Sequence, residues 1–180
     1  MSTARRTTRR GFTLVEAVAT ITILAVVSMT ASRIIFAAAD AYAGEATRAE
    51  LTLDLSAAME RMAAELRAIP SRDASPGTPW IDVATASGVT FGNGSRLALV
   101  SDRLELTIEG GPARALLEDV AAFELTYFDE AGQPINAPVA GAARDTIRRI
   151  GVSVTRGKHG VVEQLRTRVY IRSAAAGGGA

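Results

Sequence analysis

The chain has 180 residues, with 20 Lys and Arg against 19 Asp and Glu, and a net charge of +1 argues against a strongly basic nucleic-acid-binding protein. It contains no cysteine, which excludes disulfides and thiolate metal ligands, and its single histidine, His159, cannot build a zinc site alone. The length leaves room for one modest folded domain beside an N-terminal segment.

A short basic leader, residues 1–11, precedes a long apolar segment, residues 12–39. The leader carries four arginines and no acid. A helix needs about 20 apolar residues, each rising about 1.5 Å, to cross a bilayer, and only Glu16 and Arg33 interrupt the apolar segment. We therefore predict a single-pass membrane helix. Because basic flanks stay in the cytoplasm, the C-terminal part should lie on the other side of the membrane.

Glu16 is a carboxylate inside the apolar segment. A charge at the centre of a bilayer costs about 2.5–3.5 kcal/mol on insertion scales, so a buried acid needs a partner. A cut between Gly11 and Phe12 would create an α-amine four residues before Glu16, and that ammonium could neutralise the carboxylate in its own chain or in a packed neighbour. Alternatively, Glu16 lies near the lipid headgroups and is solvated.

The sequence Gly11-Phe12-Thr13-Leu14-Val15-Glu16 after a basic leader resembles the processing motif of type IV pilins and type II secretion pseudopilins. The resemblance implies that a prepilin peptidase cuts after Gly11 and methylates the new N-terminal Phe12, and that Glu16 guides assembly. It implies a precursor in the bacterial inner membrane with a periplasmic domain, which then enters a filament or pseudopilus. The implied partners are the peptidase, the inner-membrane assembly platform, and other pilins or pseudopilins packed helix against helix.

Two other interpretations of the N-terminus remain open. In a conventional secretory signal, Ala37–Ala39 would serve as the small-residue cleavage site. The segment is long for such a signal, and it carries charges near both ends. An uncleaved membrane anchor is the second interpretation.

Cleavage after Gly11 would leave sixteen basic residues against nineteen acidic ones, so the mature chain would carry a net charge of −3.

Residues 40–69 predict an amphipathic helix that continues the apolar one and ends at Pro70. One apolar stripe recurs at steps of three and four residues: Leu51, Leu55, Met59, Met62, Leu66 and Ile69. We expect this stripe to pack on the chain's own domain, rather than in a coiled coil with another protein. Residues 17–39 contain no glycine or proline. Major pilins often have one there, so this difference favours a minor subunit.

After a predicted loop at residues 70–79, the period changes to that of β-strands throughout residues 80–172. Residues 92–95 predict a hairpin turn, and residues 156–160 predict a second hairpin loop. Strands are expected around residues 89–91, 97–100, 104–108, 113–117, 123–127, 150–154 and 161–172. Together the patterns predict an α+β, pilin-like fold, with the long helix packed on an antiparallel sheet and a disordered tail at residues 173–180.

The C-terminal half also resembles the J-type minor pseudopilins, on Asp119-Val120, residues 123–129 and residues 147–154. This resemblance implies a subunit of a type II secretion pseudopilus. A type IV pilus minor pilin, for pilus assembly, adhesion or DNA uptake, is the alternative within the same class.

No nucleophile–base pair, phosphate loop or dinucleotide motif is present, so we predict neither an enzyme nor a cofactor. Asp129 and Glu130 in a turn are a minor candidate for a calcium site. Basic residues cluster near the C-terminus: Arg148, Arg149, Arg156, Lys158, Arg166, Arg168 and Arg172. We interpret them as the solvated, protected face of a sheet. The rival is a membrane-anchored binding module, in which Arg166 and Arg168 would contact a partner such as DNA or an acidic surface.

Overall fold

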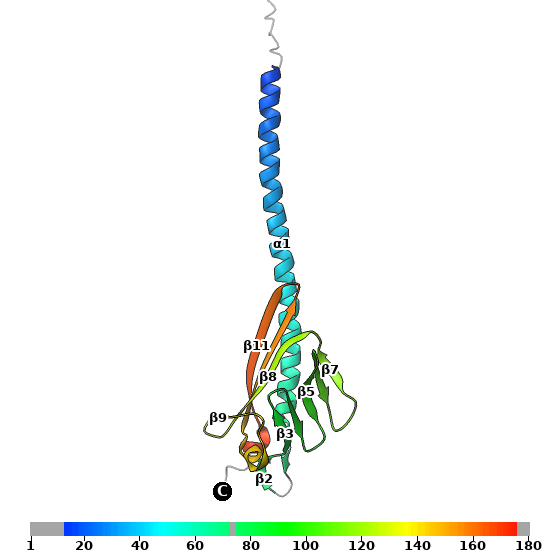
Figure 1. Cartoon of the computed structure of the whole chain (residues 1–180), viewed down its shortest axis with the longest axis vertical. Helices are drawn as coiled ribbons and strands as arrows, with labels where there is room; N and C mark the ends of the chain where they lie inside the picture. Colours follow the sequence, from blue (N-terminus) through cyan, green and yellow to red (C-terminus); the bar gives the residue numbers. More distant parts are fainter. Residues whose placement is uncertain (1–12, 73–74, 176–180) are drawn as a thin grey trace, which may run out of the picture. The chain divides into compact units, whose positions relative to one another are not determined.

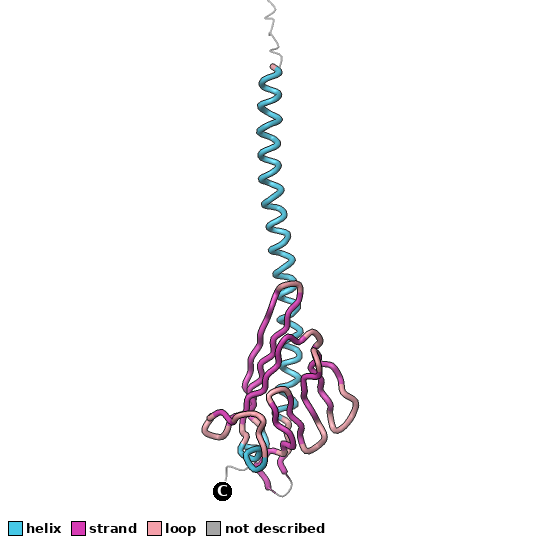
Figure 2. The backbone as a smooth tube through the Cα atoms, in the orientation of Figure 1, coloured by secondary structure: helices cyan, strands magenta, loops and turns pink. Residues whose placement is uncertain are grey.

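The structure is a computed structural model that describes residues 13–72 and 75–175. It divides into two units, residues 1–45 and 46–180, and each is considered by itself. The helix α1 (Leu14–Arg67) supplies all the described secondary structure of the first unit and enters the second. The second unit adds eleven strands and two short helices within the described residues (Figures 1 and 2).

The helix α1 is 54 residues long, which confirms that the predicted amphipathic helix continues the apolar one without a break. It ends three residues before Pro70, as expected from the steric restriction on residues preceding proline. In the second unit its predicted apolar stripe is buried: Leu51, Leu55, Met59, Met62, Leu66 and, just beyond the helix, Ile69. Burying each large aliphatic side chain contributes about 1.5–3 kcal/mol, so this stripe accounts for much of the stability of the domain.

One five-stranded antiparallel sheet follows the order β3-β4-β5-β6-β7. Its strands are β3 (Ile81–Thr85), β4 (Gly88–Phe91), β5 (Arg96–Val100), β6 (Arg103–Thr107) and β7 (Arg114–Leu117). The predicted hairpin around residues 92–95 is the β4–β5 connection, where Gly94 adopts a positive φ of 80°. The alternation of Leu104 and Leu106 with half-exposed neighbours in β6 is also confirmed.

A four-stranded antiparallel sheet has the order β11-β10-β8-β9. Its strands are β8 (Val120–Phe128), β9 (Pro134–Ile135), β10 (Arg149–Lys158) and β11 (Val161–Tyr170). The β10–β11 turn is shorter than the predicted loop at 156–160, because β10 continues to Lys158 and only His159 and Gly160 form the turn. Both turn residues have positive φ, 51° and 79°, as a type I′ hairpin requires.

The two sheets are joined around Tyr127 of β8, whose side chain is fully buried. Its hydroxyl donates a hydrogen bond to the carbonyl of Thr85 at 2.7 Å, and the carbonyl of Gly88 is a second, longer acceptor at 3.3 Å. The backbone N–H of Leu125 also reaches the carbonyl of Ala86, at 2.7 Å. Burial raises the pKa of Tyr127 well above its ordinary value. The β3–β4 turn is therefore fixed to the middle of the other sheet.

Three segments differ from the sequence predictions. Residues 70–79, expected to be a loop, contain the short antiparallel pair β1 (Ser71–Arg72) and β2 (Ser75–Pro79), and β3 was not predicted. The segment after β9 contains the 3₁₀ helix η1 (Gly141–Thr146). In the expected disordered tail, α2 (Arg172–Ala175) includes residues 173–175, and residues 176–180 lie outside the described part of the chain.

Candidate functional site

The first turn of α1 contains Glu16, the sequence-predicted assembly residue. Thr13 lies directly before the helix, and its side-chain oxygen accepts a hydrogen bond from the Glu16 backbone N–H at 3.3 Å. The Thr13 carbonyl accepts the first helical bond, from the Ala17 N–H at 3.1 Å. Thr13 is thus the N-cap and Glu16 the third helical residue, the spacing of a capping box. The Thr-x-x-Glu spacing of Thr13 and Glu16 is the signal in the sequence that could have identified this cap.

Glu16 is exposed on the helix surface in this single chain. Its position in the first turn is favourable for an anion, because the helix macrodipole carries partial positive charge at the N-terminus. Gly11 and Phe12, the predicted cleavage and methylation residues, lie outside the described residues. The pairing of Glu16 with a new N-terminal amine therefore stays a prediction.

The first unit exposes an almost continuous apolar surface along α1. Large side chains from Leu14 to Phe36 are more than half exposed, among them Val18, Ile21, Ile23, Leu24, Val27 and Ile34. Within the described residues, α1 is the one helix that is long and apolar enough to cross a membrane. An uncovered apolar surface of this length needs lipid or other helices around it.

The hydroxyl groups of this apolar segment bond to the helix backbone. Thr20 donates to the Glu16 carbonyl at 2.7 Å, and Thr22 donates to the Val18 carbonyl at 2.9 Å. Thr30 and Ser32 make equivalent bonds one turn back along the helix. An unsatisfied polar group in hydrocarbon costs several kcal/mol, so these bonds let the segment lie in lipid without polar partners.

Residues 6–32 match the family described as the prokaryotic N-terminal methylation motif. The chain carries the motif of type IV pilins and pseudopilins. Its α+β architecture, with a long N-terminal apolar helix and antiparallel sheets, is pilin-like. A search of curated proteins found no match to this pilin-like chain. The matched residues lie in the leader and the apolar segment, so they say nothing about the partners of the β-sheet domain.

The other candidates from the sequence lie in turns of the β-sheet domain. His159 is exposed in the β10–β11 turn. The Asp129 carboxylate accepts a hydrogen bond from the Gln133 backbone N–H at 2.7 Å, which closes its own turn. No group of three His, Cys, Asp or Glu side chains that could hold a metal occurs in the described part of the chain.

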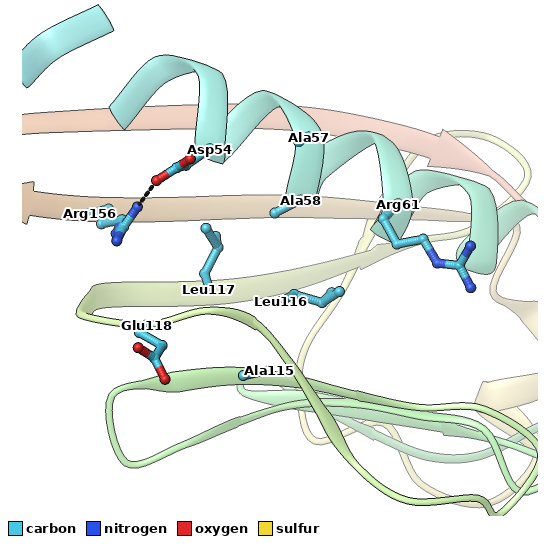
Figure 3. A pocket seen from close by; sticks show the side chains of 9 residues that line it. All are labelled: Asp54, Ala57, Ala58, Arg61, Ala115, Leu116, Leu117, Glu118 and Arg156. Carbon is cyan, nitrogen blue, oxygen red and sulfur yellow. Dashed lines mark hydrogen bonds and ion pairs between the residues drawn. The ribbon is translucent and has the colours of Figure 1, made fainter. Parts of the chain in front are cut away.

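Four residues of the C-terminal basic cluster separate into two pairs, Arg156 with Lys158 and Arg166 with Arg168. Three ion pairs link α1 to the β10–β11 hairpin: Arg48–Glu163 at 2.7 Å, Asp54–Arg156 at 2.5 Å and Glu50–Lys158 at 2.6 Å. Figure 3 shows the Asp54–Arg156 pair beside a hollow of about 550 Å³ between α1 and β7. By contrast, Arg166 and Arg168 are exposed and form no ion pair with any carboxylate in residues 13–72 and 75–175.

Proposed function

We propose that the chain is a minor pilin-like subunit of a type II secretion pseudopilus. It is made as a membrane-anchored precursor, cut after Gly11, methylated at Phe12 and assembled by packing α1 against the helices of other pilins or pseudopilins. The observation that carries this proposal is the methylation motif at residues 6–32, which leads directly into an exposed apolar helix with Glu16 in its first turn.

The proposed role of Glu16 is to align one subunit with the next. A carboxylate among apolar helices is costly, and an ammonium about 4 Å away stabilises it by about 4 kcal/mol at an effective dielectric constant of 20. The methylated amine of Phe12 in a neighbouring subunit supplies such a charge. Because this gain depends on close approach, it selects one axial position of the incoming helix over others.

The proposed topology follows from the leader and the length of α1. Four arginines precede Gly11 and no acid does, which favours a cytoplasmic N-terminus. The domain that begins near residue 46 then lies in the periplasm. Prepilin peptidase and the inner-membrane assembly platform are the partners before filament entry.

The J-like residues support a pseudopilus over a type IV pilus. Residues 123–128 lie on β8 and residues 149–154 lie on β10, and these two strands are paired neighbours. The residues that carry the J-type resemblance therefore lie on neighbouring strands of one sheet. A type IV pilus minor pilin remains the alternative, and deletion of the gene separates the two. Loss of protein secretion with normal pili supports the pseudopilus, whereas loss of pili with normal secretion supports the alternative.

Intact mass and N-terminal sequencing of the protein from its native membrane test the processing step. We expect a chain that starts at N-methylated Phe12, and an uncut chain when the prepilin peptidase gene is deleted. A start at Asp40 would instead identify an ordinary signal peptide. An uncut N-terminus in cells with active peptidase would leave a plain anchor, and the function would then lie in the sheet domain, as in the binding-module rival.

A further inference from the structure

The strand β11 is an unusually long edge strand. It is the outermost strand in the order β11-β10-β8-β9, and its ten residues pair with β10 without any irregularity (Figure 1). The other edge strands of the two large sheets, β3, β7 and β9, have five, four and two residues. Natural edge strands are usually kept short, bulged or interrupted by proline, because unpaired backbone groups recruit other chains. The strand β11 is neither short, bulged nor interrupted by proline, and charge is its one protection, from Arg166 and Arg168 on one face and Glu163 on the other.

On the edge of β11 that faces away from β10, only every second residue presents its backbone N–H and C=O groups. A two-residue hairpin turn makes its flanking residues, Lys158 and Val161, a hydrogen-bonded pair. The Ile171 N–H donates a hydrogen bond to the Arg148 carbonyl at 3.0 Å, which agrees with this alternation. Odd-numbered residues of β11 therefore bond to β10. The even-numbered residues between 162 and 170 direct their N–H and C=O groups away from β10, to the unpaired edge.

The inner face of β11, which lies toward the core, is only partly covered. Leu165 packs against the core but stays half-buried, and so do Val161 and Thr167 on the same face. The two other residues of this face are Glu163, which pairs with Arg48, and Val169, which is buried. In the neighbouring strand β10, the corresponding inward residues Val152 and Val154 are fully buried. An additional strand beside β11 would cover these side chains with its own apolar residues.

The outer face of β11 carries positive charge. Arg166 and Arg168 lie two residues apart on one face, and the Arg168 guanidinium lies 4.0 Å from the centre of the Phe128 ring. Both line a hollow of about 390 Å³ on this face, in which Glu124 is the one acid. Gly151 helps to form it, because an added Cβ there would lie 2.3 Å from Thr126 Oγ1.

We propose that β11 binds an extended segment of a partner protein by strand addition. The segment would place apolar side chains against the inner face, beside Leu165, and acidic side chains on the outer face, beside Arg166 and Arg168. Main-chain hydrogen bonds would supply affinity and the alternating side chains would supply selectivity. This inference does not depend on Glu16 or on cleavage after Gly11, so it can fail independently of the proposed function.

A second copy of the chain does not fit this edge. In an antiparallel pair of two β11 strands, Arg166 and Arg168 of one copy would meet arginines or uncharged side chains on the outer face of the other. The outer face of β11 also offers arginines and no acid to match them. The occupant is therefore a different protein.

Synthetic strands measure the binding directly. The probe is acetyl-(Val-Glu)₄-amide, titrated into the purified full-length chain in detergent micelles, with acetyl-(Val-Lys)₄-amide as the matched basic probe. We expect the acidic probe to bind at least about tenfold more tightly than the basic one. Two further versions of the acidic probe carry N-methyl groups on its odd-numbered or on its even-numbered amides. One of the two should bind about tenfold more weakly than the unmethylated probe, because its methyl groups replace the hydrogen-bond donors that face β11. Equal binding of the two unmethylated probes would overturn the proposal.

Variants of Gln164 test the backbone contribution. Its N–H faces the free edge, so Gln164→Pro removes an edge donor without breaking a bond to β10. Gln164→Ala keeps the N–H, and both substitutions lose the same side-chain bond to Ser153 Oγ, at 3.1 Å. We expect Gln164→Pro to weaken acidic-probe binding about tenfold relative to Gln164→Ala.

Charge reversal tests the acidic half of the proposal. The double variant Arg166→Glu/Arg168→Glu should exchange the preference, so that the basic probe binds better than the acidic one. Circular dichroism confirms that each variant is folded, and the N-methylated probes give a result on the unaltered chain if a variant does not fold. Identical binding by Gln164→Pro and Gln164→Ala, or an unchanged preference after charge reversal, would refute strand addition at β11.

Discussion

Replacing Tyr127 with Phe should destabilise the domain by about 1–3 kcal/mol. The substitution removes the hydroxyl that donates to the Thr85 carbonyl at 2.7 Å, and it leaves that partly buried acceptor without its side-chain partner. The ring itself is retained, so the change creates almost no cavity. For a domain of this size the loss corresponds to a fall in Tm of about 3–10 °C. Tyr170→Phe is the matched control, because the Tyr170 side chain is 43% exposed and we expect almost no effect.

The same residue predicts a dependence of stability on pH. Burial raises the pKa of Tyr127 above its ordinary value of about 10, so the folded state keeps this proton when the unfolded state has lost it. The contribution of Tyr127 is therefore fully present below pH 10 and decreases as the pH rises above 10, by up to about 1.4 kcal/mol per pH unit. Tyr127→Phe should lose stability more slowly than the unaltered chain between pH 10 and pH 11.

Thermal unfolding followed by circular dichroism measures both effects on the full chain in detergent micelles. Each variant is compared with the unaltered chain at pH 7 and between pH 9 and pH 11. If Tyr127→Phe and Tyr170→Phe unfold at the same temperature, the hydroxyl does not hold the β3–β4 turn to β8. Parallel pH profiles for Tyr127→Phe and the unaltered chain would refute the argument from burial.

Three further substitutions, one of them with a matched control, test other parts of the structure. Glu16→Leu should leave membrane insertion intact and prevent incorporation into filaments. Asp40→Asn on the same helix is the control and should assemble normally. Membrane fractionation measures insertion, and secretion or piliation assays measure incorporation. Gly151→Ala should destabilise the domain by about 1–3 kcal/mol through crowding against β8, and an unchanged Tm would contradict this. Arg156→Ala should cost about 1 kcal/mol through the lost Asp54 pair, and the effect should shrink in high salt.

The periodic elements could be predicted from sequence because their side chains carry the signal. The stripe from Leu51 to Leu66 repeats every three to four residues, and β6 alternates at every second residue, so burial on one face follows directly. The short pair β1–β2 was missed because β2 contains Pro76 and Pro79, which normally indicate a loop. The pair forms a separate two-stranded sheet whose β2 contacts η1 and α2, so its pairing reflects tertiary contacts rather than local preference.

Long-range polar contacts could not be predicted from the same patterns. Asp54 and Glu50 lie off the predicted apolar stripe of the helix, and they pair with Arg156 and Lys158, which lie 102 and 108 residues away. Helical periodicity shows which face a charge occupies and does not identify its partner. Likewise, the Tyr127 hydroxyl bonds to a backbone carbonyl, and a backbone acceptor leaves no mark in the sequence.

Strand alternation explains why Arg156 and Lys158 form ion pairs with α1 whereas Arg166 and Arg168 do not. Arg156 and Lys158 lie on the face of β10 that carries the buried Val154, so the acids of α1 neutralise them. Arg166 and Arg168 lie on the opposite face, out of reach of α1. The match at residues 6–32 is to an N-terminal methylation motif and lies outside the β-sheet domain. The proposed strand addition would place the selection of a partner in that domain, because β11 combines unpaired backbone groups with the exposed Arg166 and Arg168.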